Sequence, residues 1–182
     1  LGWGRTQGTA PFALSTDPGH HTDDWFVCQG MSANDVRSGA VQRGMGAVLR
    51  AVAEDMIKTH SFDATPVELV RAIDRAMSTG SKLEIYGREF DLSEHMAAGN
   101  EVVQEAAQAV KNSVGSGSDI DVISMTGGGA ELYRDAIQDK FPRHKVITLS
   151  SPALANVRGF HLLGEMLAKS LSKALNANKQ KP

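Results

Sequence analysis

Residues 120–140 read IDVISMTGGGAELYRDAIQDK and contain the clearest structural signal in the chain. The apolar, β-branched residues at the start of this stretch predict a strand, and the amphipathic residues at its end predict a helix. The turn between them contains Gly127, Gly128 and Gly129. Because glycine has no Cβ, a ligand can lie against bare backbone there, close to the positive end of the helix dipole. The segment is therefore typical of a phosphate or nucleoside site, although many α/β proteins have such a turn only for close packing.

The composition restricts the class of protein. The chain has 182 residues, 41% of them hydrophobic, which is enough for a substantial core in one ordinary domain. It has 19 basic and 21 acidic residues, a net charge of −2, so direct binding to nucleic acid is not expected. We recognise neither a run of roughly 18 apolar residues nor a signal peptide, and we expect no membrane association. The single cysteine, Cys28, excludes an internal disulfide and fits a cytoplasmic location.

The order of the other patterns predicts an α/β layered domain. A hairpin is expected between Phe12 and Cys28, with its turn at residues 16–19. Further elements follow along the chain: a helix from Val41 to His60, a capped helix from Thr65 to Met77, a small hairpin at 82–92, a helix interrupted at Gly99–Asn100, a strand at 145–149, and a last helix after Pro152. We assign residues 1–10 to a linker, 11–175 to the domain and 176–182 to a polar tail. Gly159 and Gly164 are expected to let the last helix pack closely against the sheet.

The turn of the first hairpin contains a second candidate motif, DPGHHTDDW at residues 17–25. Gly19 allows the backbone to turn so that its amides face a ligand, and Thr22 can add a hydroxyl donor. Asp17 can hold a water bound to Mg²⁺ or orient an attacking water. Asp, Pro and Gly also form ordinary hairpins in proteins of every fold, so the turn alone does not establish a site.

Four polar residues of this turn could also be considered as a transition-metal cluster: His20, His21, Asp23 and Asp24. Neighbouring residues on a strand point to opposite faces, so only some of these side chains could converge on one ion. We therefore interpret them as polar residues that face the solvent.

Four segments occur in the order found in the actin-like ATPases, and together they resemble that superfamily: Asp17–Thr22, Arg37–Ala40, Thr126–Ala130, and the sequence ANVRGF at 155–160. The chain is most similar to the bacterial plasmid-segregation branch, the ParM/StbA type. The resemblance covers residues 11–172 but only the C-terminal half of the family's fold. It implies an actin-like, RNase-H-like domain in which helices flank a mixed sheet.

The resemblance also implies roles for residues of the first hairpin. Asp17 would be the catalytic carboxylate and would order Mg²⁺ through its water shell. Gly19, His20 and Thr22 would bind the phosphates. The loop has His20 and His21 where relatives often have a small residue, so its contact with phosphate is expected to differ.

The nucleoside would lie against Gly127, Gly128 and Gly129 in the same comparison. Glu68 and Arg71 are in the region where such proteins contact the ribose and the base. The implied ligands are ATP or GTP with Mg²⁺, and the implied activity is ATP hydrolysis. The implied partners are further copies of the protein in a filament and an adaptor protein that links the filament to plasmid DNA.

The family has its first phosphate loop and a water-activating side chain in an N-terminal half, and neither is found in this sequence. The opening residues LGWGRTQG resemble a linker, so we expect a separated half that is inactive alone. Two other hypotheses remain open. The chain could be a non-catalytic assembly module with the same fold, or a member of the same superfold that resembles sugar kinases or Hsp70.

Overall fold

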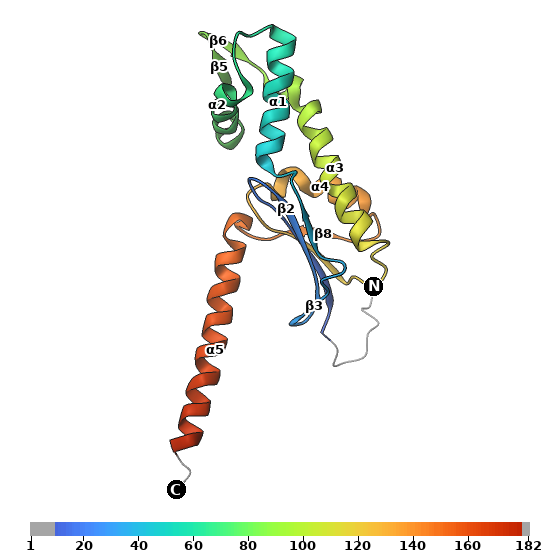
Figure 1. Cartoon of the computed structure of the whole chain (residues 1–182), viewed down its shortest axis with the longest axis vertical. Helices are drawn as coiled ribbons and strands as arrows, with labels where there is room; N and C mark the ends of the chain where they lie inside the picture. Colours follow the sequence, from blue (N-terminus) through green and yellow to red (C-terminus); the bar gives the residue numbers. More distant parts are fainter. Residues whose placement is uncertain (1–9, 180–182) are drawn as a thin grey trace.

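The structure is a computed structural model that describes residues 10–179. The predicted linker at 1–10 and the last three residues of the predicted tail therefore lie almost entirely outside the described residues. Figure 1 shows three parts: a sheet with its covering helices, which we call the sheet body; a group of helices and a hairpin above it, which we call the lobe; and one long helix that extends away from both.

The sheet is mixed, as predicted, with strand β1 (Phe12–Pro18) at its centre. Strand β1 pairs antiparallel with β2 (Asp23–Gln29) on one side and parallel with β7 (Val122–Met125) on the other. The remaining strands are β8 (Val146–Thr148), parallel to β7, and two short strands that pair with β2, β3 (Ser32–Ala33) and β4 (Gly39–Val41). The predicted hairpin is thus confirmed, but its strands are longer, so that Asp17 belongs to β1 and the turn is at residues 19–22.

Helices α3 (Met96–Val114) and α4 (Ala130–Lys140) cover one face of the sheet. Strand residues alternate between the two faces, so every second side chain points into this core. The buried residues from the strands of this sheet are Leu14, Thr16, Pro18, Asp23, Trp25, Val27, Ile123, Met125 and Val146. On the opposite face, Phe26 is 47% and Ile147 is 37% exposed. Only one face of the sheet is therefore fully covered within the described residues.

The lobe has a second core of its own. It consists of α1 (Met45–His60), α2 (Pro66–Thr79), the hairpin β5 (Leu83–Ile85) and β6 (Arg88–Phe90), and the short 3₁₀ helix η1 (Leu92–His95). Its buried apolar residues are Leu49, Val52, Ala53, Met56, Leu69, Ile73, Ala76, Leu83 and Ile85. Helix α1 connects the two cores, because Val48 packs into the sheet body and Leu49 into the lobe.

The predicted capping of α2 is confirmed. Thr65 is the N-cap, Pro66 is the first helical residue, and Glu68 completes the capping box. Gly80 ends the helix in the left-handed conformation with φ 65°.

Two predicted helix boundaries are wrong, and in both cases tertiary packing explains the difference. The first helix begins at Met45 and not at Val41, because Val41 pairs with Asp23 in strand β4. Helix α3 continues without a break through Gly99. A Cβ at Gly99 would lie only 3.0 Å from a methyl group of Val48, so the glycine allows α1 and α3 to approach closely.

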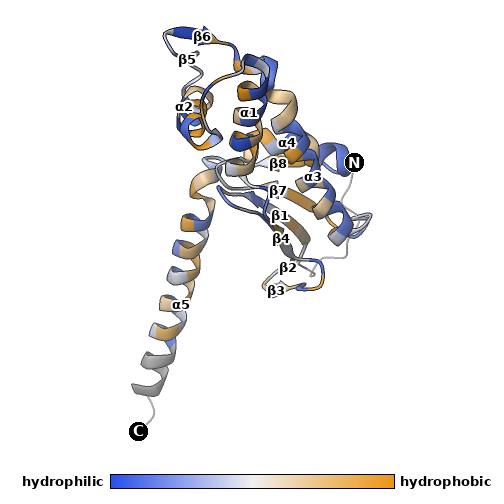
Figure 2. Ribbon diagram, turned by 45° about the horizontal axis from the view of Figure 1, so that its top comes forward, coloured by the Kyte–Doolittle hydropathy of each residue, from blue (hydrophilic) through white to orange (hydrophobic). Residues whose placement is uncertain are grey.

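Helix α5 (Ala155–Lys179) follows the 3₁₀ turn η2 (Pro152–Leu154) and does not pack along the sheet, contrary to the prediction. A Cβ at Gly159 or Gly164 would have no atom within 4 Å. Figure 2 shows hydrophobic residues recurring along the extended helix. The exposed large apolar residues of this segment are Leu154, Val157, Phe160, Leu162, Leu163, Met166, Leu167 and Leu171. None of the helices within residues 10–179 is long and apolar enough to cross a lipid bilayer.

Candidate functional site

The two sequence motifs meet at one edge of the sheet. Strands β1 and β7 are parallel neighbours, so their carboxyl ends lie at the same edge, where ligands of α/β sheets commonly bind. Two backbone hydrogen bonds join the end of β1 to the glycine turn that follows β7. The Thr126 amide donates to the Thr16 carbonyl at 2.8 Å, and the Gly129 amide donates to the Pro18 carbonyl at 2.9 Å. The aspartate hairpin and the glycine turn therefore form one structural unit.

The three glycines of the turn differ in what surrounds them. Gly127 has φ +79°, and a Cβ there would lie 2.1 Å from Oδ1 of Asp17, so no other residue fits. At Gly129 a Cβ would lie 3.0 Å from the Met45 side chain. At Gly128 a Cβ would have no atom within 4 Å. Gly127 and Gly129 are thus explained by packing, whereas Gly128 leaves open space beside the backbone.

That open space belongs to a cavity of about 350 Å³ between the two motifs and the lobe. Four residues predicted to bind phosphate or nucleoside line it: Gly19, His20, Gly128 and Gly129. The other lining residues are Met45 at the start of α1, Asp74, Met77 and Ser78 on α2, and Glu131 and Leu132 on α4. The cavity therefore has the hairpin loop on one side, the glycine turn and α4 on another, and α2 on a third.

Glu68 and Arg71 do not line this cavity. The Glu68 carboxylate accepts hydrogen bonds from the Thr65 amide at 2.5 Å and the Thr65 hydroxyl at 2.7 Å. The hydrogen bond from the backbone amide is the main cause that lowers the pKa of Glu68. Arg71 is exposed, three residues before Asp74. The roles of Glu68 and Arg71 in nucleoside binding remain predictions.

The sequence reasoning missed the α2 residues that do line the cavity. A signal for them existed, because Arg71, Asp74 and Ser78 are spaced three and four residues apart and so share one face of a helix. The spacing identifies the face of the helix but not which of its residues lie near the site. That depends on how α2 is placed relative to the glycine turn, which the sequence pattern does not contain.

The carboxylate of Asp17 is held from two sides. Its Oδ2 accepts a hydrogen bond of 2.6 Å from Nδ2 of Asn156, near the start of α5, and its Oδ1 lies against Gly127. A single carboxylate beside the hairpin loop suits Mg²⁺, which usually takes one or two carboxylates together with phosphate oxygens of a substrate. The contact with Asn156 links residues 139 positions apart in the sequence and could not have been found from spacing.

Two further polar groups of the hairpin loop, the Thr22 hydroxyl and the Gly19 amide, bond within the loop. The Thr22 hydroxyl donates to Oδ2 of Asp24 at 2.7 Å, and the Gly19 amide donates to the Thr22 carbonyl at 2.8 Å. Neither Thr22 nor Asp17 lines the cavity. The predicted contact between Thr22 and phosphate therefore remains a prediction that requires the hydroxyl to change partner.

Asp23 is not a solvent-facing residue, and this prediction was wrong. Its side chain points to the covered face of the sheet and is 0% exposed. Neither carboxylate oxygen has a hydrogen-bond partner among the described residues. Burial, followed by the nearby charges of Asp24 and Asp17, raises the pKa of Asp23 to about 7.

Tyr133 of α4 lies on the same buried side. Its hydroxyl donates to the carbonyl of Arg43, just before α1, at 2.5 Å. Burial, with a smaller contribution from Asp23, raises the pKa of Tyr133, so the hydroxyl stays protonated and continues to donate. This bond fixes α4 against the start of α1, below the candidate site.

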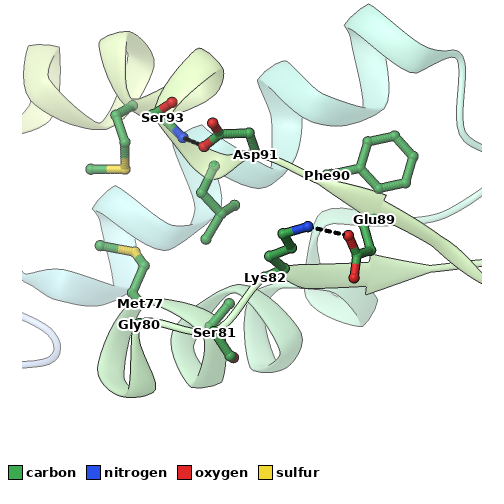
Figure 3. A pocket seen from close by; sticks show the side chains of 11 residues that line it. Met77, Gly80, Ser81, Lys82, Glu89, Phe90, Asp91 and Ser93 are labelled. Carbon is green, nitrogen blue, oxygen red and sulfur yellow. Dashed lines mark hydrogen bonds and ion pairs between the residues drawn. The ribbon is translucent and has the colours of Figure 1, made fainter.

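A larger cavity, of about 700 Å³, lies beyond the end of α2. Figure 3 shows its walls, with the ion pair between Lys82 and Glu89 at one side and the Asp91 carboxylate capping Ser93 at another. Met77 lines both cavities. We place the candidate site in the smaller cavity because it unites the hairpin loop and the glycine turn, neither of which reaches the larger one.

The sequence matches the family model described as "Archaeal actin homologue MreB-like, C-terminal" over residues 15–139. The chain belongs to this family of actin homologues. The matched range contains the aspartate hairpin, the lobe and the glycine turn, that is, every element that lines the candidate site. No curated protein matches the sequence.

Solved structures of actin-like proteins have the same fold. The archaeal actin homologue Ta0583 in complex with ADP aligns with a TM-score of 0.72 at 16% identity, over 86% of this chain and 50% of that one. A ParM filament from Clostridium botulinum also gives 0.72, at 17% identity, over 86% and 46%. The apo pSK41 ParM protein gives 0.63, at 18% identity, over 94% and 47%. The chain thus spans about half the length of these actin-like proteins and has the actin-like fold.

Proposed function

We propose that this chain is the nucleotide-binding C-terminal half of an actin-like ATPase that polymerises into filaments. One observation carries the proposal: the Asp17 hairpin and the glycine turn, each only moderately specific alone, are bonded to each other and line one cavity with an open glycine at its wall. The ADP-bound structure of a similar protein supports a nucleotide as the ligand.

In this proposal, ATP or GTP lies with its nucleoside against Gly128 and Gly129 and its phosphates toward Gly19 and His20. The start of α4, capped only by backbone at Gly129, directs the positive end of a helix dipole toward the ligand. Asp17 would hold a water of the Mg²⁺ shell, and the chemistry that Mg²⁺ would supply there is neutralisation of charge on the phosphates. The side chain that activates the attacking water would come from the rest of the protein.

The second wall of the cleft would be the portion of the actin-like fold that this chain does not cover. Two apolar surfaces are available for it: the open face of the sheet at Phe26 and Ile147, and the exposed stripe on α5 that includes Phe160. An exposed apolar surface of this extent normally marks an interface. Nucleotide should therefore bind weakly to this chain alone and more tightly when both walls are present.

The biological setting follows by analogy with the plasmid-segregation branch and is part of the proposal. Copies of the protein would associate into filaments in the cytoplasm, and an adaptor protein would link a filament to plasmid DNA. The net charge of −2 agrees with an indirect link to DNA. The filament structure of a similar ParM supports self-assembly as the mode of action.

The proposal is tested by a pair of substitutions at Gly128 in the full-length protein. Gly128→Ala adds a Cβ into open space, whereas Gly128→Leu extends a side chain into the cavity, and both have the same effect on backbone freedom. We expect Gly128→Leu to fold normally and to weaken ATP binding at least tenfold, while Gly128→Ala changes it much less. Binding is measured by fluorescence titration with an ATP analogue.

Two further measurements separate the enzyme from the non-catalytic module. Asp17→Ala should abolish phosphate release without loss of folding, and ATP should promote sedimentation of the wild-type protein as polymer. Assembly that occurs without nucleotide and is unchanged by Asp17→Ala would instead support a non-catalytic assembly module. Equal ATP affinity of Gly128→Leu and the wild type would contradict the proposed site.

A further inference from the structure

The bond between Asn156 and Asp17 connects the catalytic candidate to a helix that otherwise leaves the domain. Asp17 is at the end of β1, and Asn156 is the second residue of α5. Nδ2 of Asn156 donates to Oδ2 of Asp17 at 2.6 Å, and a hydrogen bond to an ionised carboxylate is stronger than one between neutral groups. With Oδ1 packed against Gly127, this bond fixes both oxygens of the carboxylate.

The segment before Asn156 is itself attached to the glycine turn. The Pro152 carbonyl accepts a hydrogen bond of 3.0 Å from the Gly127 amide, and the Leu154 amide donates to the Ser151 carbonyl at 2.9 Å. Arg158 donates to the Ser150 carbonyl at 2.6 Å. The first turn of α5 is therefore anchored beside the candidate site, whereas the large apolar residues from Phe160 to Leu171 are exposed.

We infer that Asn156 is a positioning residue for Asp17, and that the orientation of α5 thereby sets the orientation of the carboxylate. This inference rests on the proposed function. A carboxylate that holds water must point in a defined direction, and misplacement by an ångström lowers catalytic rates strongly. Because α5 is the part of the chain that a second domain would contact, docking of that domain is transmitted to Asp17 through one side chain.

The bond has little expected effect on folding. It lies at the surface, where a hydrogen bond replaces bonds to water and so contributes little net stability. A purely structural role would predict a loss of stability. A positioning role predicts a large change in catalytic rate with a small change in stability. The two roles can therefore be separated by experiment.

The test uses Asn156→Ala and Asn156→Asp in the full-length protein, with Arg158→Ala as a control on the same turn that bonds to Ser150 and not to Asp17. The kcat and KM for ATP are measured in the wild-type background, and the Mg²⁺ requirement is measured there and in Asp17→Asn. We expect Asn156→Ala to lower kcat about tenfold with nearly unchanged KM and a raised Mg²⁺ requirement. Asn156→Asp, which places two carboxylates together, should have a larger effect, and Arg158→Ala less than a twofold effect.

The double variant gives the decisive comparison. Because Asp17→Asn is itself expected to abolish hydrolysis, this comparison uses the Mg²⁺ concentration that supports binding of an ATP analogue. If Asn156 acts through Asp17, Asn156→Ala should not change this Mg²⁺ dependence further once Asp17→Asn is present. An unchanged kcat for both Asn156 variants, or the same change in Mg²⁺ dependence with and without Asp17→Asn, would overturn the inference while leaving nucleotide binding intact. A wild-type protein that binds no ATP would overturn the proposed function and this inference with it.

Discussion

The sheet body and helix α5 both have apolar side chains at regular spacing, yet these side chains have opposite surroundings. Phe141, at the end of α4, is 1% exposed, and Phe160, on α5, is 74% exposed. On the covered face of the sheet, the apolar side chains have their packing partners within the described chain. The comparison shows that periodicity predicts which face of a helix or strand is apolar. It does not predict which segment packs against that face, because this depends on the rest of the molecule.

The strongest test of this contrast is a matched pair of alanine substitutions. Phe141→Ala should destabilise this chain by about 3–5 kcal/mol, because it leaves a cavity in a packed core. Phe160→Ala should change the stability by less than about 0.5 kcal/mol, because the ring is exposed. Urea unfolding followed by circular dichroism measures both. A large loss from Phe160→Ala in the chain alone would show that α5 packs onto the sheet body in solution.

A second test concerns the buried carboxyl of Asp23. Burial raises its pKa from the ordinary value of 3.8 to about 7 in the folded state, so the folded state binds the proton more tightly. The carboxyl therefore destabilises the fold progressively as the pH rises from about 4 to about 7, and the full cost persists above that pH. Replacing it with an apolar residue of similar size, Asp23→Leu, should remove this cost.

The expected gain of Asp23→Leu is about 2–4 kcal/mol at pH 8 and far less at pH 4. Asp35→Leu, at an exposed carboxylate that does not contribute to the raised pKa of Asp23, serves as the control and should show no such pH-dependent gain. The measurement is the difference in unfolding free energy from the wild type at several pH values. A difference that does not grow between pH 4 and pH 7 would mean that Asp23 is solvated or paired in solution.

A third test compares two glycines. Gly127→Ala combines a positive φ with a Cβ 2.1 Å from the Asp17 carboxylate, so it should cost about 2 kcal/mol or more and displace the hairpin loop. Gly159→Ala, within α5, should stabilise the helix by about 0.5–1 kcal/mol because nothing surrounds its Cβ. Thermal melts of the two variants should therefore shift in opposite directions, and a shift in the same direction would contradict the described environments.

The smallest expected effect concerns how the helices begin. Thr65→Ala removes the capping box of α2 and should cost about 1 kcal/mol. Arg158→Ala, on the first turn of α5, removes only an exposed bond to Ser150 and should cost less than about 0.5 kcal/mol in stability. Denaturant titration of both variants checks the difference. Equal losses would show that the start of α5 supports the sheet body more than its exposure indicates.

Local signals predicted most of the fold. The capping box at Thr65, the stop at Gly80 and the strand and helix around the glycine turn all depend on neighbours in the sequence, and the structure has them where they were predicted. The errors occur where contacts with distant segments of the chain determine the boundary of a helix or strand. Val41 joins a strand because Asp23 is beside it, and Gly99 remains helical because α1 packs against it.

The candidate site likewise has a part that the sequence predicted and a part that it did not. Residue types and spacing indicated the hairpin loop and the glycine turn, and the structure places Gly19 and Gly128 on one cavity. The buried position of Asp23 could not be deduced, because a polar residue beside a turn normally faces water. The bond from Asn156 to Asp17 joins residues far apart in sequence, so only the three-dimensional arrangement shows it.

The central position of β1 also affects how the protein is made. Strand β1 pairs with β2 through a short turn, but its other edge pairs with β7, and the facing residues Thr16 and Met125 are 109 positions apart. At a synthesis rate of about 5–20 residues per second, that edge waits about 5–20 s for its partner strand to emerge from the ribosome. During this interval the nascent chain presents an unpaired strand edge, the feature most prone to wrong association. Among the strands of this sheet, the central strand is thus made first, and its second edge is paired only after β7 has emerged.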